Sequence, residues 1–270
     1  MPTSLRKCSI LVCLLIPGQF TAIAAASEVA VHIRFVDAPR TAGDPARNSH
    51  RKQTTAPHST EHSTAHSEAR IVLWLTPNSP EVRQQAQAQN PAPRAYTMVQ
   101  QGKMFSPHML VIPVGSTVSF PNKDPFFHNV FSLFNGRRFD LGLYQSGQTR
   151  SVAFNRLGVS YIFCNIHPEM SAVILTLDTP YYASPDEKGD IRLSGVPEGS
   201  YTLHIWSEAT SPEALQLLTR TITVSAGEGG DHLTSLGEIQ IHTAPSMLSE
   251  HLNKFGEPYD KHDTQISPAY

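Results

Sequence analysis

Three side chains with metal-binding chemistry lie close together near residue 165 of the chain. Cys164 is followed three residues later by His167, and three residues after that by Met170, in the stretch CNIHPEM. A cysteine thiolate, a histidine imidazole and a methionine thioether are donors for soft and borderline transition metals. Apolar runs precede and follow this stretch. We therefore expect a short loop between two strands that turns the three side chains toward one point.

A fourth donor has to come from elsewhere in the chain, and His128 is the obvious candidate. It lies upstream at the start of another apolar run, in the sequence PFFHNVF. Two imidazoles, one thiolate and one weak axial thioether form the ligand set of a blue-copper electron-transfer site. The residues therefore predict one copper ion, cycling between Cu(I) and Cu(II), with His128, Cys164, His167 and Met170 as its ligands.

Other interpretations of Cys164 stay open at this point. One is a structural zinc site, although such sites normally use more cysteines. Another is a cysteine nucleophile paired with His128 or His167, although no oriented third group is evident. A third is a buried, inert thiol. Binuclear copper and multicopper oxidase chemistry are not expected, because they need a second cysteine or several His-x-His pairs.

The elements that must position these ligands are predicted to be short β-strands. Over residues 95–179, apolar or alternating runs recur at short spacing and are separated by glycines, which is typical of an all-β sandwich or Greek-key barrel. A smaller β pattern follows over residues 180–243. Residues 244–270 are polar and aperiodic, so we predict a loose tail there. The fold class is therefore all-β, with two β units.

The segment before these units, residues 27–94, is predicted to hold two strands and polar connections. Glu28–Val36 and Ala69–Leu75 both read as strands. Because the region 95–179 is short, Ala69–Leu75 is a candidate for one further strand of it. Asn78 to about Arg94 is predicted to be a polar linker.

A histidine-rich stretch lies between the two predicted strands. His58, His62 and His66 recur every four residues without an accompanying apolar stripe. We predict a flexible insertion, and the alternative is a segment that captures metal.

The first 26 residues are predicted to be a secretory signal. Arg6 and Lys7 precede the apolar run Cys8–Ile16, and small residues end at Ala26. The apolar run is too short to cross a bilayer, so no membrane span is expected. Two of the three cysteines would leave with the signal, and Cys164 would be a lone thiol in the periplasm, where thiols usually pair. A bound metal would explain that unpaired thiol.

The charge balance bears on the class of partner. The chain has 21 Lys+Arg and 23 Asp+Glu, and its formal net charge is -2. Nucleic-acid binding is therefore not expected.

At the ligand residues the sequence resembles a cupredoxin, and specifically the amicyanin and plastocyanin branch. The resemblance rests on His128-Asn129-Val130, on the Cys-x2-His-x2-Met loop with Pro168, and on flanking turn and strand residues within 95–179. It implies a Greek-key cupredoxin sandwich with the four copper ligands named above. It also implies that Asn129 ties the two ligand-bearing loops together behind the metal.

The downstream segment, residues 186–201, resembles a carboxypeptidase regulatory-like β-sandwich of the transthyretin-like, Ig-like type. The two units in this order resemble exported proteins described as methylamine-utilisation-like.

These observations predict an exported electron carrier that transforms no substrate and is therefore not an enzyme. Its partner would be a redox protein, such as a c-type cytochrome or a dehydrogenase, and electrons would pass near His167. Four phenylalanines near His128 are expected to pack around the copper or to form a docking patch: Phe126, Phe127, Phe131 and Phe134. The alternative function is a copper-binding storage or sensing module. A structural adaptor with a vestigial site is a third possibility.

Overall fold

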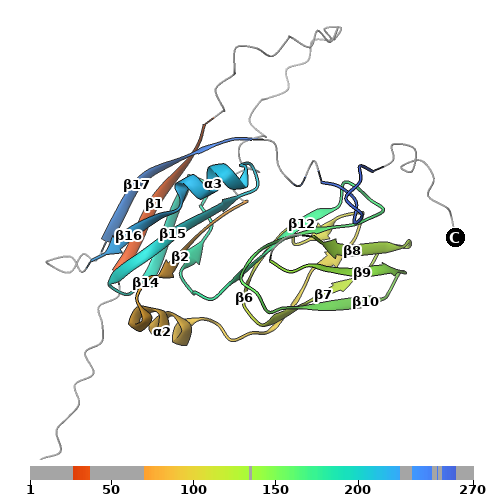
Figure 1. The fold of residues 1–270 in the computed structure, drawn as a ribbon, viewed down its shortest axis with the longest axis horizontal. Coiled ribbons are helices and arrows are strands. Elements are labelled where there is room, and N and C mark those ends of the chain that lie inside the picture. The colour runs from red at the N-terminus through yellow and green to blue at the C-terminus, as the bar shows by residue number, and fades with distance from the viewer. Residues whose placement is uncertain are drawn as a thin grey trace, which may run out of the picture.

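The structure is a computed structural model, and it describes residues 27–36, 70–133, 136–225, 233–244, 248 and 251–259. The predicted signal, the histidine-rich stretch and Phe134 lie outside these residues. The described strands form two β units that lie side by side (Figure 1). The prediction of an all-β fold is confirmed. Among the described helices, none has the length and apolar character needed to cross a membrane.

The unit that contains the predicted ligands, here called the ligand-bearing unit, is built from strands within residues 95–177. Strands β6, β12, β11, β8 and β9 form a five-stranded sheet, β10, β7 and β3 form a three-stranded sheet, and β4 pairs with β5. The strand bounds are β3 Ala95–Thr97, β4 Val99–Gln100, β5 Phe105–Ser106, β6 Met109–Pro113, β7 Ser116–Pro121, β8 His128–Ser132, β9 Phe139–Tyr144, β10 Thr149–Phe154, β11 Gly158–Phe163 and β12 Ser171–Leu177.

The other unit, here called the companion unit, combines strands from both ends of the chain. One of its sheets has the order β14-β1-β17 and the other has the order β13-β2-β15-β16. Its elements are β1 Ser27–Val36, β2 Ile71–Pro77, α2 Pro80–Gln89, β13 Tyr182–Ala183, β14 Asp190–Val196, β15 Gly199–Ser207, α3 Pro212–Leu218, β16 Arg220–Val224 and β17 Leu233–His242.

Two local expectations from the sequence are corrected by these elements. Strand β2 pairs with β15 and β13, so the segment at residues 69–75 belongs to the companion unit and adds no strand to the ligand-bearing unit. The predicted polar linker contains helix α2. Ser79 caps this helix by accepting a hydrogen bond from the Val82 N–H, and Pro80 occupies its first turn.

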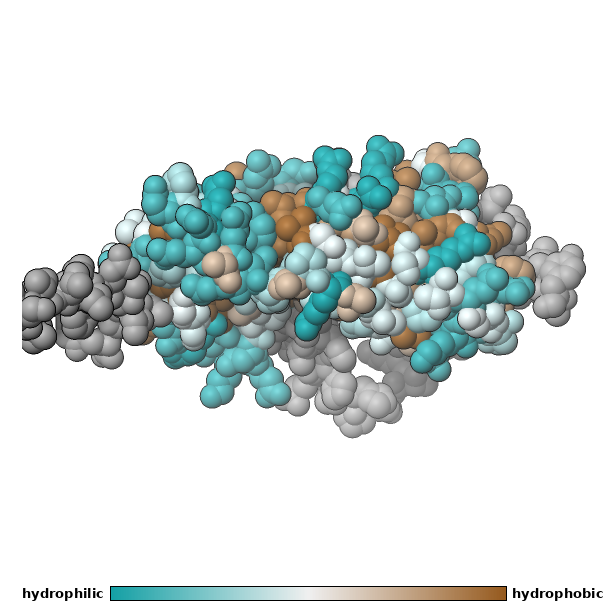
Figure 2. Space-filling view, turned by 90° about the horizontal axis from the view of Figure 1, so that it is seen from below, coloured by the Kyte–Doolittle hydropathy of each residue, from teal (hydrophilic) through white to brown (hydrophobic). Residues whose placement is uncertain are grey.

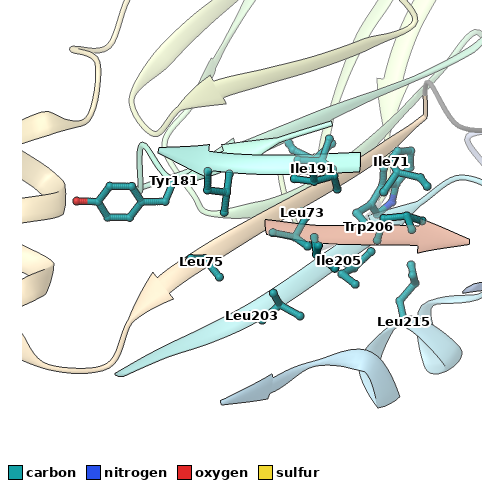
Figure 3. Packing of buried hydrophobic residues seen from close by; sticks show 14 of the residues in the cluster. Ile71, Leu73, Leu75, Tyr181, Ile191, Leu203, Ile205, Trp206 and Leu215 are labelled. Atoms are coloured by element: carbon teal, nitrogen blue, oxygen red, sulfur yellow. The ribbon is translucent and has the colours of Figure 1, made fainter. Parts of the chain in front are cut away.

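The hydrophobic side chains form two cores. The companion core packs β2 and β15 against β14 and α3 through Leu73, Ile205 and Leu215 (Figure 3). The second core fills the ligand-bearing unit and includes Cys164 and Met170. Successive side chains of a strand point to opposite faces of its sheet. Strand β12 is buried on both faces, so it contributes side chains to both cores.

The alternation of β12 is visible in its residues. Val173 and Leu175 belong to the companion core, whereas Ala172 and Ile174 belong to the core of the ligand-bearing unit. The five-stranded sheet therefore lies between the two cores and contributes side chains to both. Burial of a Leu or Ile side chain stabilises a fold by about 1.5–3 kcal/mol, so the side chains that this sheet buries in the companion core stabilise the packing of the two units.

A charged cluster also bridges the two units. Glu208 accepts a hydrogen bond from Arg70 at 2.8 Å, and its other oxygen lies 3.0 Å from Nε2 of His108. His108 precedes β6 in the ligand-bearing unit, and the other two residues flank strands of the companion unit. The same three residues line a cavity that is also lined by Pro168 and Glu169 of the predicted ligand loop.

Candidate metal centre

The predicted ligand loop connects β11 to β12. Phe163, the last residue of β11, pairs with Ser171, the first residue of β12, so Cys164 and Met170 stand at the two ends of the loop. The N–H of Cys164 donates to the carbonyl of Met170 at 3.2 Å, and the N–H of Met170 donates to the carbonyl of His167 at 3.0 Å. These two bonds fold the loop into a tight turn.

Strand β8 brings His128 to this loop. Phe131 of β8 pairs with Phe163 of β11, and His128 begins β8. Nδ1 of His128 lies 3.8 Å from the Cys164 sulfur and 3.1 Å from Nδ1 of His167, and the sulfur lies 3.6 Å from Nδ1 of His167. The fold therefore gathers three of the four predicted ligands from two segments that are distant in sequence.

The arrangement of these three donor atoms is compatible with a copper ion. All three side chains are buried, and their donor atoms form a group that could hold one ion. Protein nitrogen and sulfur ligands bind ions at about 2.0–2.3 Å, so two such ligands on one ion lie closer together than about 4.5 Å. The three measured separations meet that condition. The donor types, two imidazoles and one thiol, are those that copper accepts.

Met170, the predicted fourth ligand, is fully buried and belongs to the same hydrophobic core as Cys164. Its backbone closes the ligand loop, as described above. The structure therefore places Met170 at the end of the ligand loop and in the same core as Cys164.

Asp124 is a functional candidate that sequence reasoning missed. Its carboxylate lies 2.8 Å from Nε2 of His128. The same carboxylate accepts hydrogen bonds from the backbone N–H groups of Gly102 at 2.6 Å and Lys103 at 3.0 Å. A carboxylate on the outer nitrogen of a metal-binding histidine fixes the ring and leaves the other nitrogen free to bind. The available signal was an acidic residue four positions before a candidate ligand.

The surroundings keep both imidazoles neutral at ordinary pH. Burial lowers the pKa of His128, and the opposing hydrogen bond and charge of Asp124 only partly offset this. Burial is the main cause that lowers the pKa of His167 to about 4, and the neighbouring His128 and Lys103 also disfavour its protonated form. A neutral imidazole has a lone pair available for a metal, so both rings are ready to act as ligands.

The pKa of the Cys164 thiol and the pKa of the Asp124 carboxyl shift in opposite directions. Burial raises the pKa of Cys164, although backbone N–H groups of Asn129, Ile166 and His167 favour its thiolate. Burial would also raise the pKa of Asp124, but the hydrogen bonds that it accepts outweigh burial and lower it. Asp124 is therefore ionised at neutral pH, while Cys164 needs a nearby cation to ionise.

Asn129 contacts the site through its backbone and β9 through its side chain. Its side-chain amide donates to Asp140 at 2.7 Å, and its backbone N–H favours the thiolate form of Cys164. Asp140 lies on β9, next to β8 in the sheet. The side chain of Asn129 thus braces the strand that begins at His128.

The phenylalanines near His128 have different environments. The Phe126 ring lies 5.2 Å from that of His128 and 5.5 Å from that of His167, so it covers the pair. Phe131 is buried in the companion core. Phe127 is 46% exposed, and Ile166 of the ligand loop is 42% exposed. Phe126 therefore packs against the two imidazoles as expected, whereas Phe131 packs in the companion core and not around the donors, and Phe127 is exposed.

The C-terminal residues also reach the ligand loop. Residues 251–259, here called the C-terminal segment, lie within the predicted loose tail, but Tyr259 donates a hydrogen bond to the carbonyl of Cys164 at 3.0 Å. Figure 1 draws this segment in dark blue near the end of the sheet where β8 and β12 lie. No sequence pattern indicated this contact.

Comparisons with known proteins give matches among solved structures only. No family model matches the chain, and no curated protein does. A purple cupredoxin from Nitrosopumilus maritimus is 26% identical, with a TM-score of 0.28, over 30% of this chain and 98% of that one. A reduced amicyanin variant is 22% identical, with a TM-score of 0.30, over 34% of this chain and 90% of that one.

A copper-containing nitrite reductase from Thermus scotoductus SA-01 is 28% identical, with a TM-score of 0.31, over 38% of this chain and 27% of that one. By their descriptions these structural neighbours are a cupredoxin, an amicyanin and a copper-containing nitrite reductase, and each likeness covers well under half of this chain. None of them supports the resemblance of residues 180–243 to a carboxypeptidase regulatory-like sandwich, or of the whole chain to methylamine-utilisation-like proteins. Those two resemblances stay predictions.

Proposed function

We propose that the chain is an exported mononuclear type 1 copper protein that carries single electrons between redox partners. The observation that carries the proposal is the convergence of His128, Cys164 and His167. Their donor atoms lie 3.1–3.8 Å apart in a buried position, and Met170 ends the same loop. Bound copper would supply one-electron chemistry between Cu(I) and Cu(II).

The residues around the donors keep the site rigid and dry. Asp124 fixes the His128 ring, and the backbone bonds of the ligand loop fix Cys164 relative to Met170. Phe126 covers both imidazoles. A ligand set that cannot rearrange favours fast electron exchange, because little structural change accompanies the change in charge.

Electrons would enter and leave near His167. This residue is 9% exposed, and three apolar residues near the site are exposed by 42–64%: Met104, Phe127 and Ile166. The face that Figure 2 shows from below is mostly hydrophilic, with hydrophobic groups in its middle and over the ligand-bearing half. The exposed apolar side chains named above suit brief docking of a redox protein, such as a c-type cytochrome or a dehydrogenase.

An exported location is part of the proposal. The predicted signal over residues 1–26 would direct the chain to the periplasm. Among the described residues Cys164 is the free cysteine, and it is buried. Metal binding by its sulfur would protect the thiol from disulfide exchange in that compartment.

Copper loading and spectroscopy test the proposal. Purified protein with Cu(II) should show an intense visible thiolate-to-copper absorption band and a narrow copper hyperfine splitting, with one ion per chain. Cys164→Ser should abolish the band because serine offers no thiolate, while circular dichroism of the metal-free variant stays unchanged. A colourless protein with ordinary tetragonal copper would contradict the proposal.

The same experiment addresses the alternative of a copper storage or sensing module. That function would give more than one tightly held copper per chain, and deletion of residues 50–68 would remove the excess. Reversible one-electron voltammetry with one copper per chain would favour the carrier. The proposal also holds that the chain transforms no substrate and is not an enzyme.

A further inference from the structure

The C-terminal segment contacts the ligand loop at several points. Besides the bond from Tyr259 to the carbonyl of Cys164, the N–H of Lys254 donates to the side-chain oxygen of Asn165 at 2.8 Å. The His251 ring stacks on Phe163, with ring centres 4.0 Å apart and planes 13° apart. These contacts reach three consecutive residues of the chain, from the end of β11 into the loop.

The same segment also reaches the strands that carry His128. Nζ of Lys254 lies 2.8 Å from one carboxylate oxygen of Asp140, and the other oxygen of Asp140 accepts from the side chain of Asn129. Asn129 follows His128 directly on β8. The C-terminal segment therefore connects the loop that bears Cys164 to the strand that bears His128.

The bond from Tyr259 is well suited to hold the loop. The Cys164 carbonyl belongs to the residue whose sulfur faces the two imidazoles, so fixing this carbonyl limits rotation of the backbone that carries the sulfur.

We propose that the C-terminal segment is a clamp that holds the ligand loop closed, with Tyr259 and His251 as its positioning residues. The clamp limits how often the loop opens to expose the Cys164 sulfur. Its consequence for copper retention rests on the proposed function, because a loop that opens less often releases a bound metal more slowly. The clamp itself can be tested on the metal-free protein.

The rate at which iodoacetamide alkylates Cys164 measures loop opening, because the side chain is fully buried in the closed loop. Alkylation is followed by mass spectrometry of the peptide that contains Cys164. Tyr259→Phe should raise the rate about five-fold, since one hydrogen bond contributes about 1 kcal/mol net. His251→Ala should raise the rate at least as much. Lys254→Ala should raise it about two-fold, because the ion pair of Lys254 with Asp140 is partly exposed.

Tyr201→Phe is the matched control. Tyr201 likewise donates to a backbone carbonyl, that of Pro197 at 2.7 Å, but it is buried in the companion unit. It should leave the alkylation rate unchanged. Denaturant unfolding of each variant separates local opening from global unfolding. Lys254→Ala keeps the test available if one of the aromatic variants fails to fold.

Two measurements distinguish failure of the clamp from failure of the proposed function. Unchanged alkylation in Tyr259→Phe, His251→Ala and Lys254→Ala would overturn the clamp, whether or not the protein binds copper. Faster alkylation in a protein that binds no copper would support the clamp and contradict the proposed function. If both hold, the same variants should release Cu(I) to a chelator faster than the wild type, by a similar factor.

Discussion

At the scale of single residues, the carboxylate of Asp124 links the metal centre to the rest of the fold. It contacts Nε2 of His128 and accepts two backbone N–H groups from the turn at Gly102 and Lys103. An ionised carboxylate here places negative charge close to the proposed copper. It would therefore act electrostatically on a bound copper ion and structurally on the turn.

Asp124→Asn should separate these two effects. Loss of the negative charge should favour Cu(I) over Cu(II) and raise the reduction potential measured by voltammetry. The asparagine side chain is a weaker acceptor for the two backbone N–H groups than the carboxylate, so the variant should also have a free energy of unfolding lower by about 1–3 kcal/mol. Asp186→Asn is the control, because Asp186 also accepts two backbone N–H groups but lies in the companion unit. It should leave the potential unchanged, and an equal shift in both variants would contradict this role of Asp124.

At the scale of elements, β12 is the strand on which both the site and the packing of the two units depend. Its first residue follows Met170, and its alternate side chains enter different cores. Strand β11 pairs with β12 along its whole length, so the two ends of the ligand loop stay in register. A change on one face of β12 should therefore have a different consequence from a change on the other.

Ile174→Ala and Leu175→Ala test the two faces of β12. Both side chains are fully buried, so each substitution should lower the free energy of unfolding by about 2–5 kcal/mol. Ile174 shares its core with Cys164 and Met170, and its loss should also shift the visible copper band. Leu175 faces the companion core, and its loss should leave the band in place. A band that shifts in Leu175→Ala but not in Ile174→Ala would show that the site does not depend on the core of the ligand-bearing unit.

At the scale of the whole molecule, the two units are joined by the shared sheet and by the cluster of Arg70, Glu208 and His108. Burial alone would raise the pKa of Glu208, but the bond from His108 and the charge of Arg70 outweigh it and lower the pKa. A carboxyl whose pKa is lower in the folded state than in the unfolded chain stabilises the fold above its ordinary pKa. That stabilisation is lost as the pH falls through the lowered value.

Glu208→Gln should therefore reduce stability at neutral pH, by about 1–3 kcal/mol, and have little effect at low pH. The ordinary pKa of a glutamate is 4.5, so the difference between wild type and variant should shrink as the pH falls below about 4.5. Chemical unfolding at several pH values measures this. Glu198→Gln, at an exposed position of the companion unit, should change stability little at any pH. A constant difference for Glu208→Gln across pH would contradict the prediction.

Local sequence patterns predict the strands around the ligand loop, but neither helix α2 nor the sheet to which β2 belongs. Alternation and turn residues predicted strands on both sides of the ligand loop, because these patterns depend only on neighbours along the chain. The sequence does not predict helix α2, although Ser79 and Pro80 form a helix start signal, because the segment has no apolar stripe and resembles a linker. The pattern at residues 69–75 predicts a strand but not its sheet, because pairing partners are set by long-range packing.

The amino-acid sequence by itself determined the donor types, their spacing in the ligand loop and the all-β character of the chain. These features follow from side-chain chemistry and local periodicity. Only the tertiary structure decided that Asp124 orients His128, that the companion unit packs against the back of the sheet, and that the C-terminal segment contacts Cys164. Such contacts join residues that are remote in the chain or lie on turns without periodicity. Their energies depend on three-dimensional proximity, which no local pattern encodes.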